Sequence, residues 1–513
     1  MSAETDQQTS LRVPEMRGPN IARGITSLTV QNLGTSTLGF IFLGALLRLL
    51  PNTEYGVYSA ASITVGIATA LSTLGLQYAS ARYLSLLGTN DQAGSWMMTK
   101  RIIVLSVIIA GAVTIGFELI AAPLSIYFAK STRWTFVFAL SGLWLFSGSI
   151  SLVLQGILQG MKRYASLAKI LFVTRLAMVG LSTLALLLYQ NVLTAIVGWI
   201  IYSVIISIWI GRIVSRDFVR KNQDPKQGLL GYSQVLKYCL PLGLSGLLTI
   251  VTSNSDLLVV GGYLSPASLG VYNTAVTISS VLTFILITPL ITAFLPEMSS
   301  AHDTSDLSIG FRLALRFVML AILPASFIVA AIPRQLLELF SGGGSYLGGS
   351  ESLELISFFY VFLAIQTLIF SLLQAVGSTK QVLLITALTT LVEFGISATA
   401  VPLLGIMGAA IARAATPVFG MTISIYLARK FITKLGPLRF YLRALVCSSI
   451  PFLVVWSLSF FFSESLLTII PYSLTAAVVF VLCLRGLRML TEEDRALLRH
   501  ILPRLLANVL RYV

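Results

Sequence analysis

Long apolar runs alternate with short polar connections along almost the whole chain. A membrane-spanning helix needs about 20 mostly apolar residues, and on that measure we expect fourteen spans. The first six are predicted near Ile25–Leu50, Tyr55–Ala79, Ile102–Ala122, Trp134–Leu154, Ser166–Tyr189 and Val192–Ile213. Eight more are predicted near Tyr238–Tyr263, Leu269–Leu295, Phe311–Ala331, Leu355–Val376, Gln381–Pro402, Ile406–Tyr426, Leu442–Phe462 and Leu466–Leu484. The predicted fold class is an all-α polytopic membrane protein.

Two connections between apolar runs repeat each other. The hairpins Leu50–Ala61 and Leu264–Ala275 share a Gly-Val-Tyr triplet at a shift of 214 residues, and Gln159 recurs as Gln374 at a shift of 215. Two landmarks with nearly the same offset indicate one ancestral unit used twice. Because each unit holds an even number of helices, six, we expect parallel repeats related by an axis along the membrane normal.

The spans and the repeat together predict the organisation of the chain. A polar cytoplasmic tail (1–20) precedes an N-lobe of six helices (21–213), a basic cytoplasmic connector (214–236) and a C-lobe of six helices (237–427). Two extra helices (428–490) follow the repeat. Residues 491–513 place leucines on one stripe and arginines away from it, which predicts an amphipathic helix on the cytoplasmic membrane surface; a frayed tail is the alternative.

Composition and charge support the membrane class and set the orientation. Hydrophobic residues make up 56% of the chain and charged residues 11%, against about 25% charged in soluble domains. With the N-terminus inside, 29 of the 35 lysines and arginines fall in cytoplasmic segments and four fall outside. This split explains the net charge of +15 by the positive-inside rule rather than by nucleic acid. We therefore expect a multi-pass protein of the cell membrane, without a secretory signal peptide and with both termini in the cytoplasm.

The residues that catalysis would require are scarce. The three cysteines lie in or at the ends of apolar runs, which is typical of apolar packing rather than of a metal site, and there are only two histidines. No Gly-rich phosphate loop, nucleophile elbow or metal-ligand cluster is found. We expect no enzyme activity and no cofactor.

Charged residues within the spans are the main candidates for function, since each costs about 2.5–3.5 kcal/mol at the membrane centre. Glu393 and Arg413 flank the turn Pro402–Gly405 at similar distances, so a helical hairpin puts them at one depth. Either they form a structural ion pair, or Arg413 binds an anion while Glu393 orients it or binds a coupling cation. H⁺ and Na⁺ are both open as the coupling ion.

Arg175 is the second intramembrane arginine, and no acid lies at its depth in the neighbouring spans of the first half. It is therefore the better candidate for an anion site. Lys169 and Arg82, nearer the cytoplasm, could line the entrance of that site. Snorkelling to the interface explains them equally well.

Two further polar groups occur at membrane depth. Asp256 and Asn254 belong to the run Thr252–Asp256, whose five polar residues cannot all face one way; we expect a helix that is unwound or bordered by water. Cation coordination is one interpretation of this pair. Gln31 and Asn32 form a milder polar face, for which hydrogen bonding between helices is the main alternative to contact with a ligand.

Several segments resemble a known family. The hairpin Leu50–Tyr58, the segment Gly75–Tyr83 and the segment Gly405–Ala412 are similar to those of Wzx-type polysaccharide flippases of the multidrug/oligosaccharidyl-lipid/polysaccharide (MOP) exporter superfamily. The resemblance implies two six-helix lobes around a central cavity and transfer of a lipid-linked oligosaccharide from the cytoplasmic to the outer leaflet by alternating access. It implies membrane lipids and other polysaccharide-assembly proteins as partners.

The residues suit the function that the resemblance implies. Arg175 and Arg413 supply one arginine per lobe for a phosphate or pyrophosphate head group, because the planar guanidinium meets phosphate oxygens in pairs. A cation-coupled multidrug antiporter of the same superfamily is the first alternative and favours acids in the cavity. A membrane glycan polymerase or ligase, and a scaffold without transport activity, are the others.

Overall fold

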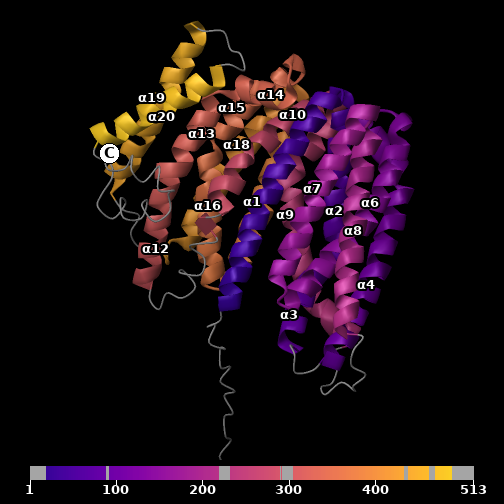
Figure 1. Cartoon of the computed structure of the whole chain (residues 1–513). Coiled ribbons are helices and arrows are strands. Elements are labelled where there is room, and N and C mark those ends of the chain that lie inside the picture. The colour runs from indigo at the N-terminus through magenta and orange to yellow at the C-terminus, as the bar shows by residue number, and fades with distance from the viewer. Residues whose placement is uncertain are drawn as a thin grey trace, which may run out of the picture.

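The computed structural model describes residues 19–87, 92–218, 231–288, 290–291, 304–432, 437–461 and 468–487. These residues form a bundle of long helices (Figure 1). In the first half the α-helices are α1 Pro19–Leu49, α2 Asn52–Thr73, α3 Leu76–Leu87, α4 Gln92–Leu119, α5 Ala121–Ala129, α6 Thr135–Gly160, α7 Tyr164–Tyr189 and α8 Val192–Phe218.

The second half continues with the same kind of element. Its α-helices are α9 Tyr232–Tyr263, α10 Pro266–Ser279, α12 Thr304–Phe317, α13 Leu323–Ala331, α14 Pro333–Ser341, α15 Ser350–Phe358, α16 Tyr360–Ala375, α17 Thr379–Leu404, α18 Ile406–Ala428, α19 Leu438–Phe461 and α20 Ile469–Gly486. Short 3₁₀ segments lie at η1 Thr132–Trp134 and η4 Gly344–Gly349, and π-helical segments lie at η2 Thr283–Ile287 and η3 Val318–Ile322.

The polytopic class predicted from hydropathy is confirmed. Twelve helices in the described ranges are long and apolar enough to cross a membrane, and the pair formed by Gly344–Phe358 and Tyr360–Ala375, bent by 43°, raises the number to 13. The count of fourteen is not confirmed, because the span expected near Leu269–Leu295 is broken into α10 and η2 and its last residues lie outside the described part. Residues 1–18 of the predicted tail (1–20) and the predicted surface helix 491–513 also lie outside it, whereas residues 19 and 20 already belong to α1.

The second predicted span is two helices rather than one. Leu74 and Gly75 both adopt positive φ angles, 42° and 77°, so that α2 ends and α3 starts in a new direction. Gly75 is suited to this break because a side chain there would meet the carbonyl oxygen of Cys239 in α9 at 2.7 Å. Glycine avoids both the strain and the clash.

The internal repeat appears in the turns at both ends of two helices. α7 and α17 have the same length and start 215 residues apart. Before them, the amide of Arg163 donates to the carbonyl of Leu158 at 3.1 Å, and the amide of Ser378 donates to that of Leu373 at 2.8 Å. In both turns the residue before this amide has a positive φ, 58° and 73°. This is the Schellman pattern of a helix C-terminus. It recurs at the same offset of 215 residues that relates the two sequence repeats.

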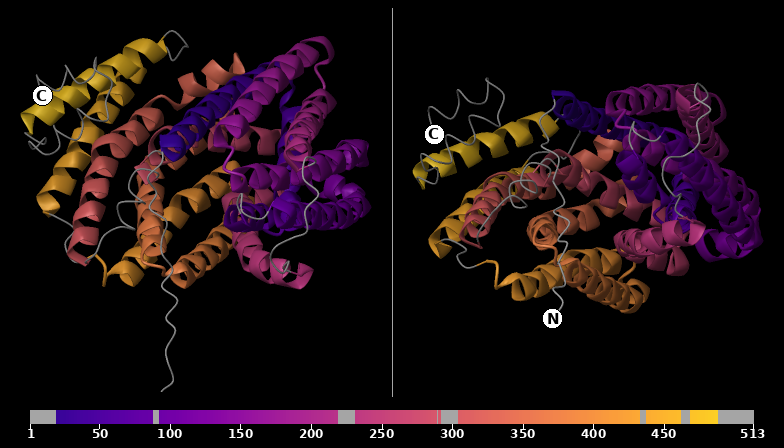
Figure 2. Two further views of the ribbon diagram at one scale, coloured as in Figure 1. Left: turned by 60° about the horizontal axis from the view of Figure 1, so that its bottom comes forward. Right: turned by 90° about the horizontal axis from the view of Figure 1, so that it is seen from below.

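The helices of each half pack mainly with one another. α1 packs on α7 and α6 on α8 in the first half, whereas α17 packs on α18 and α16 on α18 in the second. Figure 2 shows the indigo-to-magenta helices on one side and the orange helices on the other, with α19 and α20 at the edge beyond α13.

The halves meet through α2, which packs on α10 and α9. The repeated hairpins lie face to face here: a side chain on Gly56 would come within 1.7 Å of the Pro266 carbonyl oxygen, and one on Gly270 within 3.1 Å of the Gly56 nitrogen. Asn273 donates a hydrogen bond to Ser59, its counterpart 214 residues earlier, at 3.0 Å. Contact between equivalent positions is what a two-fold axis between the repeats produces.

Candidate functional site

A cavity of about 1150 Å³ lies between the two halves. Its lining comes from α1, α2, α3, α6, α7 and α8 of the first half and from α9 and α10 of the second. A smaller cavity of about 270 Å³ adjoins it and is also lined by Tyr58, Arg175, Trp199 and Thr277. Arg175 therefore faces both spaces.

Aromatic rings, rather than acids, surround Arg175. Its guanidinium lies 4.4 Å from the ring centre of Trp199 and 5.9 Å from that of Tyr202, both on α8. α1 can approach it closely because position 39 is glycine, where a Cβ would lie 3.3 Å from an Arg175 nitrogen. Within the described residues the structure gives Arg175 no ion pair. Arg175 lines a cavity large enough for a ligand, and its guanidinium is the forked donor that suits phosphate.

The aromatic residues around Arg175 form one connected group. Trp199 stacks on Trp144 at 5.2 Å between ring centres, and its ring nitrogen donates to the Tyr58 hydroxyl at 2.8 Å. Tyr58 also stacks on Trp144 at 6.5 Å. Sequence reasoning missed this group, although tryptophans in the middle of predicted spans, away from the interfaces where they are usual, were a signal.

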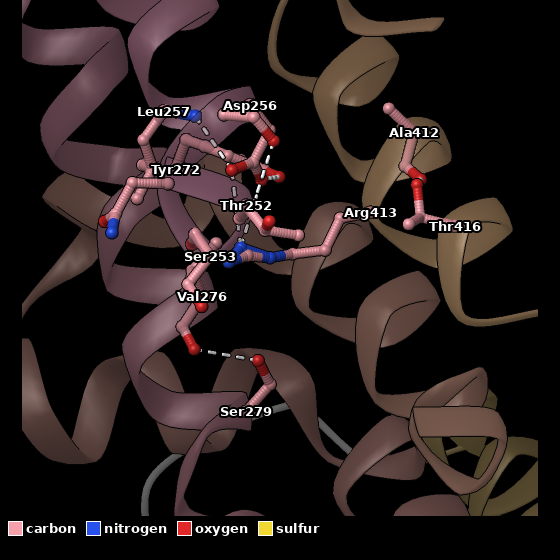
Figure 3. Close-up of polar contacts among 12 residues, drawn as sticks. Thr252, Ser253, Asp256, Leu257, Tyr272, Val276, Ser279, Ala412, Arg413 and Thr416 are labelled. Carbon is pink, nitrogen blue, oxygen red and sulfur yellow. Dashed lines mark hydrogen bonds and ion pairs between the residues drawn. The ribbon is translucent and has the colours of Figure 1, made fainter. Parts of the chain in front are cut away.

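Arg413 lies in a different environment. Its guanidinium forms an ion pair with Asp256 at 3.1 Å and donates to the carbonyl of Ser253 at 2.7 Å (Figure 3). The Tyr272 hydroxyl donates to the same carboxylate at 2.5 Å, and the Leu257 amide donates to it at 2.8 Å. Asp256 is fully buried, so Arg413 compensates a charge inside the protein and does not line the cavity.

Glu393 belongs to the same cluster but is not the ion-pair partner predicted for Arg413. The hairpin of α17 and α18 does bring the two residues close, yet the ion pair goes to Asp256 of α9. Glu393 is 5% exposed, lies close enough to Ser255 for a hydrogen bond and interacts electrostatically with Asp256 and Arg413. Three charged residues, two of them acids, therefore share one buried site.

The polar run Thr252–Asp256 does not unwind its helix, contrary to one of the two expectations. α9 is continuous from Tyr232 to Tyr263, because the short side chains bond to carbonyl oxygens one turn earlier, as Ser253 does to Thr249 and Asn254 to Ile250 at 2.8 Å. Thr252 also bonds to Thr390 of α17. Asn254 lines the smaller cavity, in line with the other expectation.

The remaining predicted residues divide between the cavity and its surroundings. Gln31 lines the large cavity, whereas Asn32 is exposed on another face of α1. Lys169 is exposed and Arg82 lies 4.5 Å over the ring of Tyr238 in α9; the lining described above includes neither. Of the four predicted head-group cations, Arg175 alone lines the cavity among the residues that the structure covers.

At the end of the bundle that holds the two hairpins, hydrogen bonds join the first half of the chain to the second. Arg48 donates to the carbonyls of Leu339 at 2.6 Å and Phe340 at 3.3 Å. Asn52 donates to that of Ser345 at 2.6 Å, and Lys130 to that of Gly261 at 3.2 Å. At the opposite end, the Leu74–Gly75 break packs against Gly243 of α9. The halves are thus in contact on both sides of the cavity.

Comparison with known proteins identifies the family. A sequence model described as polysaccharide biosynthesis protein matches residues 45–344. The chain belongs to this family. No curated protein matches it in sequence.

Several solved structures share the fold of this family member. A structure titled lipid II flippase MurJ, inward closed conformation, has a TM-score of 0.75 at 13% identity and covers 91% of this chain and 99% of its own. An inward-facing multidrug transporter of the MOP superfamily has a TM-score of 0.60 at 16% identity, covering 80% and 100%. A MOP superfamily transporter from Pyrococcus furiosus has 0.56 at 18%, covering 81% and 97%. The expected MOP fold is confirmed.

Proposed function

We propose that this protein flips a lipid-linked oligosaccharide from the cytoplasmic to the outer leaflet of the cell membrane. The observation that carries the proposal is Arg175, an arginine without an ion pair that faces a cavity between the two halves. A buried cation costs free energy unless it has a partner, and the phosphate of a polyprenyl-linked glycan would be one. The family's role in polysaccharide biosynthesis supports this substrate class.

Transfer would proceed by alternating access. The phosphate head group would lie against Arg175 with the glycan in the large cavity, and separation of the halves at one end or the other would expose it to each side. Arg175 holds the head group, and the aromatic group on α6 and α8 keeps its guanidinium aimed at the cavity. The two termini would lie in the cytoplasm, and other polysaccharide-assembly proteins would supply and consume the substrate.

The multidrug antiporter is less consistent with this lining. A cavity for cationic drugs needs acids, but the acids Asp256 and Glu393 lie outside the lining of both cavities in the described residues. Of these two acids, Asp256 is already neutralised by Arg413. These contacts favour an anionic substrate.

The test is transfer in proteoliposomes. A lipid-linked oligosaccharide is supplied in one leaflet, and an impermeant glycan-cleaving enzyme reports its arrival in the other. Loss of one charge-assisted hydrogen bond is worth about 1.5–3 kcal/mol, so Arg175→Gln should slow transfer at least about tenfold. Arg163→Gln is the control, because Arg163 is exposed and pairs with Asp217 far from the cavity lining. Equal rates for wild type and Arg175→Gln would overturn the assignment of the head-group site.

For energy coupling we propose proton exchange at Glu393. Arg413 and Asp256 neutralise each other, which leaves Glu393 as the second acid of a buried cluster with one cation. An unpaired buried carboxylate is costly, so gain or loss of one proton here changes the balance of the contacts that α9, α17 and α18 make. The charged and titratable neighbours of this carboxyl are Asp256, Arg413 and Tyr272.

This coupling is tested with imposed gradients. A proton gradient should accelerate wild-type transfer, and Glu393→Gln should transfer at one rate with or without it. Glu351→Gln, an exposed acid at the start of α15, should respond like wild type. Acceleration of Glu393→Gln by a proton gradient would refute the proposal, and acceleration of wild type by a sodium gradient alone would point to Na⁺ instead.

A further inference from the structure

The lining of the two cavities has an unusual charge balance. Of the residues described, 33 line the larger cavity, and Arg175 is the single one that carries a full charge; the same holds for the smaller cavity. Arg413, Lys169 and Arg82 all lie outside these linings. One cation can neutralise one anionic group, and on the proposed function that group is the phosphate of the lipid carrier.

The rest of the polar lining consists of amides and hydroxyls. Gln31, Gln77 and Gln155 face the cavity from α1, α3 and α6. Gln155 donates a hydrogen bond to Ser151, another lining residue, at 3.2 Å. Amides and hydroxyls both donate and accept hydrogen bonds, as the hydroxyl groups of sugars do.

Aromatic faces complete this lining. Tyr58, Trp144 and Trp199 form the stacked group beside Arg175, and all three line the larger cavity. Flat aromatic surfaces with a few well-placed polar groups are usual in sites for small molecules. The C–H faces of sugar rings pack on such surfaces without needing a charge.

We infer that the glycan carried through this cavity is neutral, built from uncharged sugars without uronic acid, sulfate or phosphate substituents. The inference rests on the proposed function and adds the class of glycan. A carboxylate on the glycan would lie in a lining whose one cation is already bound to the carrier phosphate, so it would lose water without gaining a partner. A neutral sugar at the same place would bond to the glutamines and hydroxyls.

The experiment compares two substrates in the same proteoliposomes. Both have the same lipid, the same phosphate linkage and the same number of sugars, but one hexose is replaced by the corresponding hexuronic acid. The neutral substrate should cross at least about tenfold faster, the ratio expected for about 1.4 kcal/mol between the two. Equal rates, or faster transfer of the acidic substrate, would overturn the inference and leave the flippase proposal standing. Failure of both to cross would overturn the proposed function itself.

A gain-of-function variant gives a second test. Gln155→Arg adds a cation to the lining and should raise transfer of the acidic substrate relative to the neutral one by about the same tenfold ratio. Gln155→Met is the matched control, because it removes the amide without adding charge and should not raise the absolute rate of transfer of the acidic substrate. An unchanged ratio in Gln155→Arg protein that still transfers the neutral substrate would contradict the inference.

Discussion

At the scale of single residues, the two arginines within the spans differ because of what touches them. Arg413 contacts the carboxylate of Asp256, which also accepts a hydrogen bond from Tyr272, and the backbone carbonyl of Ser253. Arg175 meets aromatic rings and a cavity. An arginine that is paired with a buried carboxylate stabilises the fold, whereas one that lines a cavity without an ion pair is available to a ligand. The same residue type thus has two tasks in one bundle.

The sequence predicts the first of these environments in part. The spacing of Glu393 and Arg413 around their turn correctly brings both to one site, because a helical hairpin has a fixed rise per residue. It could not identify Asp256 as the partner, since α9 is 157 residues from Arg413 along the chain and its packing on α17 is a tertiary contact. The absence of an acid at the depth of Arg175 was visible in the sequence; the rings of Trp199 and Tyr202 beside it follow only from how α8 rotates against α7.

The ion pair of Asp256 and Arg413 gives a prediction for stability. Arg413→Gln leaves a fully buried carboxylate without its cation, which typically costs about 3–5 kcal/mol. Thermal unfolding of the purified variant in detergent measures the loss. The double variant Asp256→Asn/Arg413→Gln should recover most of it, because both charges are then removed.

The exposed pair of Arg163 and Asp217 is the matched control for this measurement. The Arg163 side chain is 45% exposed, and surface ion pairs contribute about 0–1 kcal/mol. An Arg413→Gln protein as stable as Arg163→Gln would show that the buried pair is not required for folding.

At the scale of the elements, the repeat determines where helices end and which of them meet. The turns before α7 and α17 have the same hydrogen bonds, and the hairpins before α2 and α10 lie against each other. The echo of Gly-Val-Tyr was therefore a reliable guide to structure. The break at Leu74 and Gly75 was not foreseen, because the apolar run continues through it and only the approach of α9 makes a change of direction favourable.

The contact between the hairpins gives a second prediction. Gly56→Ala would bring a methyl group within 1.7 Å of the Pro266 carbonyl oxygen, and overpacking of this kind typically costs about 1–3 kcal/mol. Gly66 lies in the same helix with open space around it, so Gly66→Ala should be neutral or more stable by up to about 1 kcal/mol. The thermal unfolding midpoint of Gly56→Ala should lie below that of wild type, and the midpoint of Gly66→Ala should lie at or above it. Equal midpoints for the two variants would contradict close packing of the two halves at this end.

At the scale of the whole molecule, hydropathy and the distribution of lysines and arginines predict a polytopic membrane protein, and the fold confirms the class. The sequence offset between the two repeats also indicates which helices are equivalent. The size and lining of the cavity could not be predicted, because both depend on the distance between the halves in one conformation. That distance is set by contacts such as Arg48 to the end of α14 and Gly75 to α9, which join residues far apart in sequence.

The central claim is that the halves must separate at the hairpin end to release the substrate. The most direct measurement is leaflet transfer by a protein whose halves are joined there by a disulfide. A Cβ at Gly342 would lie 3.2 Å from Cγ of Arg48, the atom whose place a cysteine sulfur would take, so Arg48→Cys/Gly342→Cys in a background with the native cysteines replaced by alanine provides the lock. Val271→Cys/Gly349→Cys, at 3.1 Å within the second half, is the control.

The account predicts that the oxidised Arg48→Cys/Gly342→Cys protein does not transfer the lipid-linked oligosaccharide, that reduction restores transfer, and that the control pair transfers in both states. Full transfer by the oxidised locked protein would contradict it, because the substrate would then cross without opening of the two halves at this end.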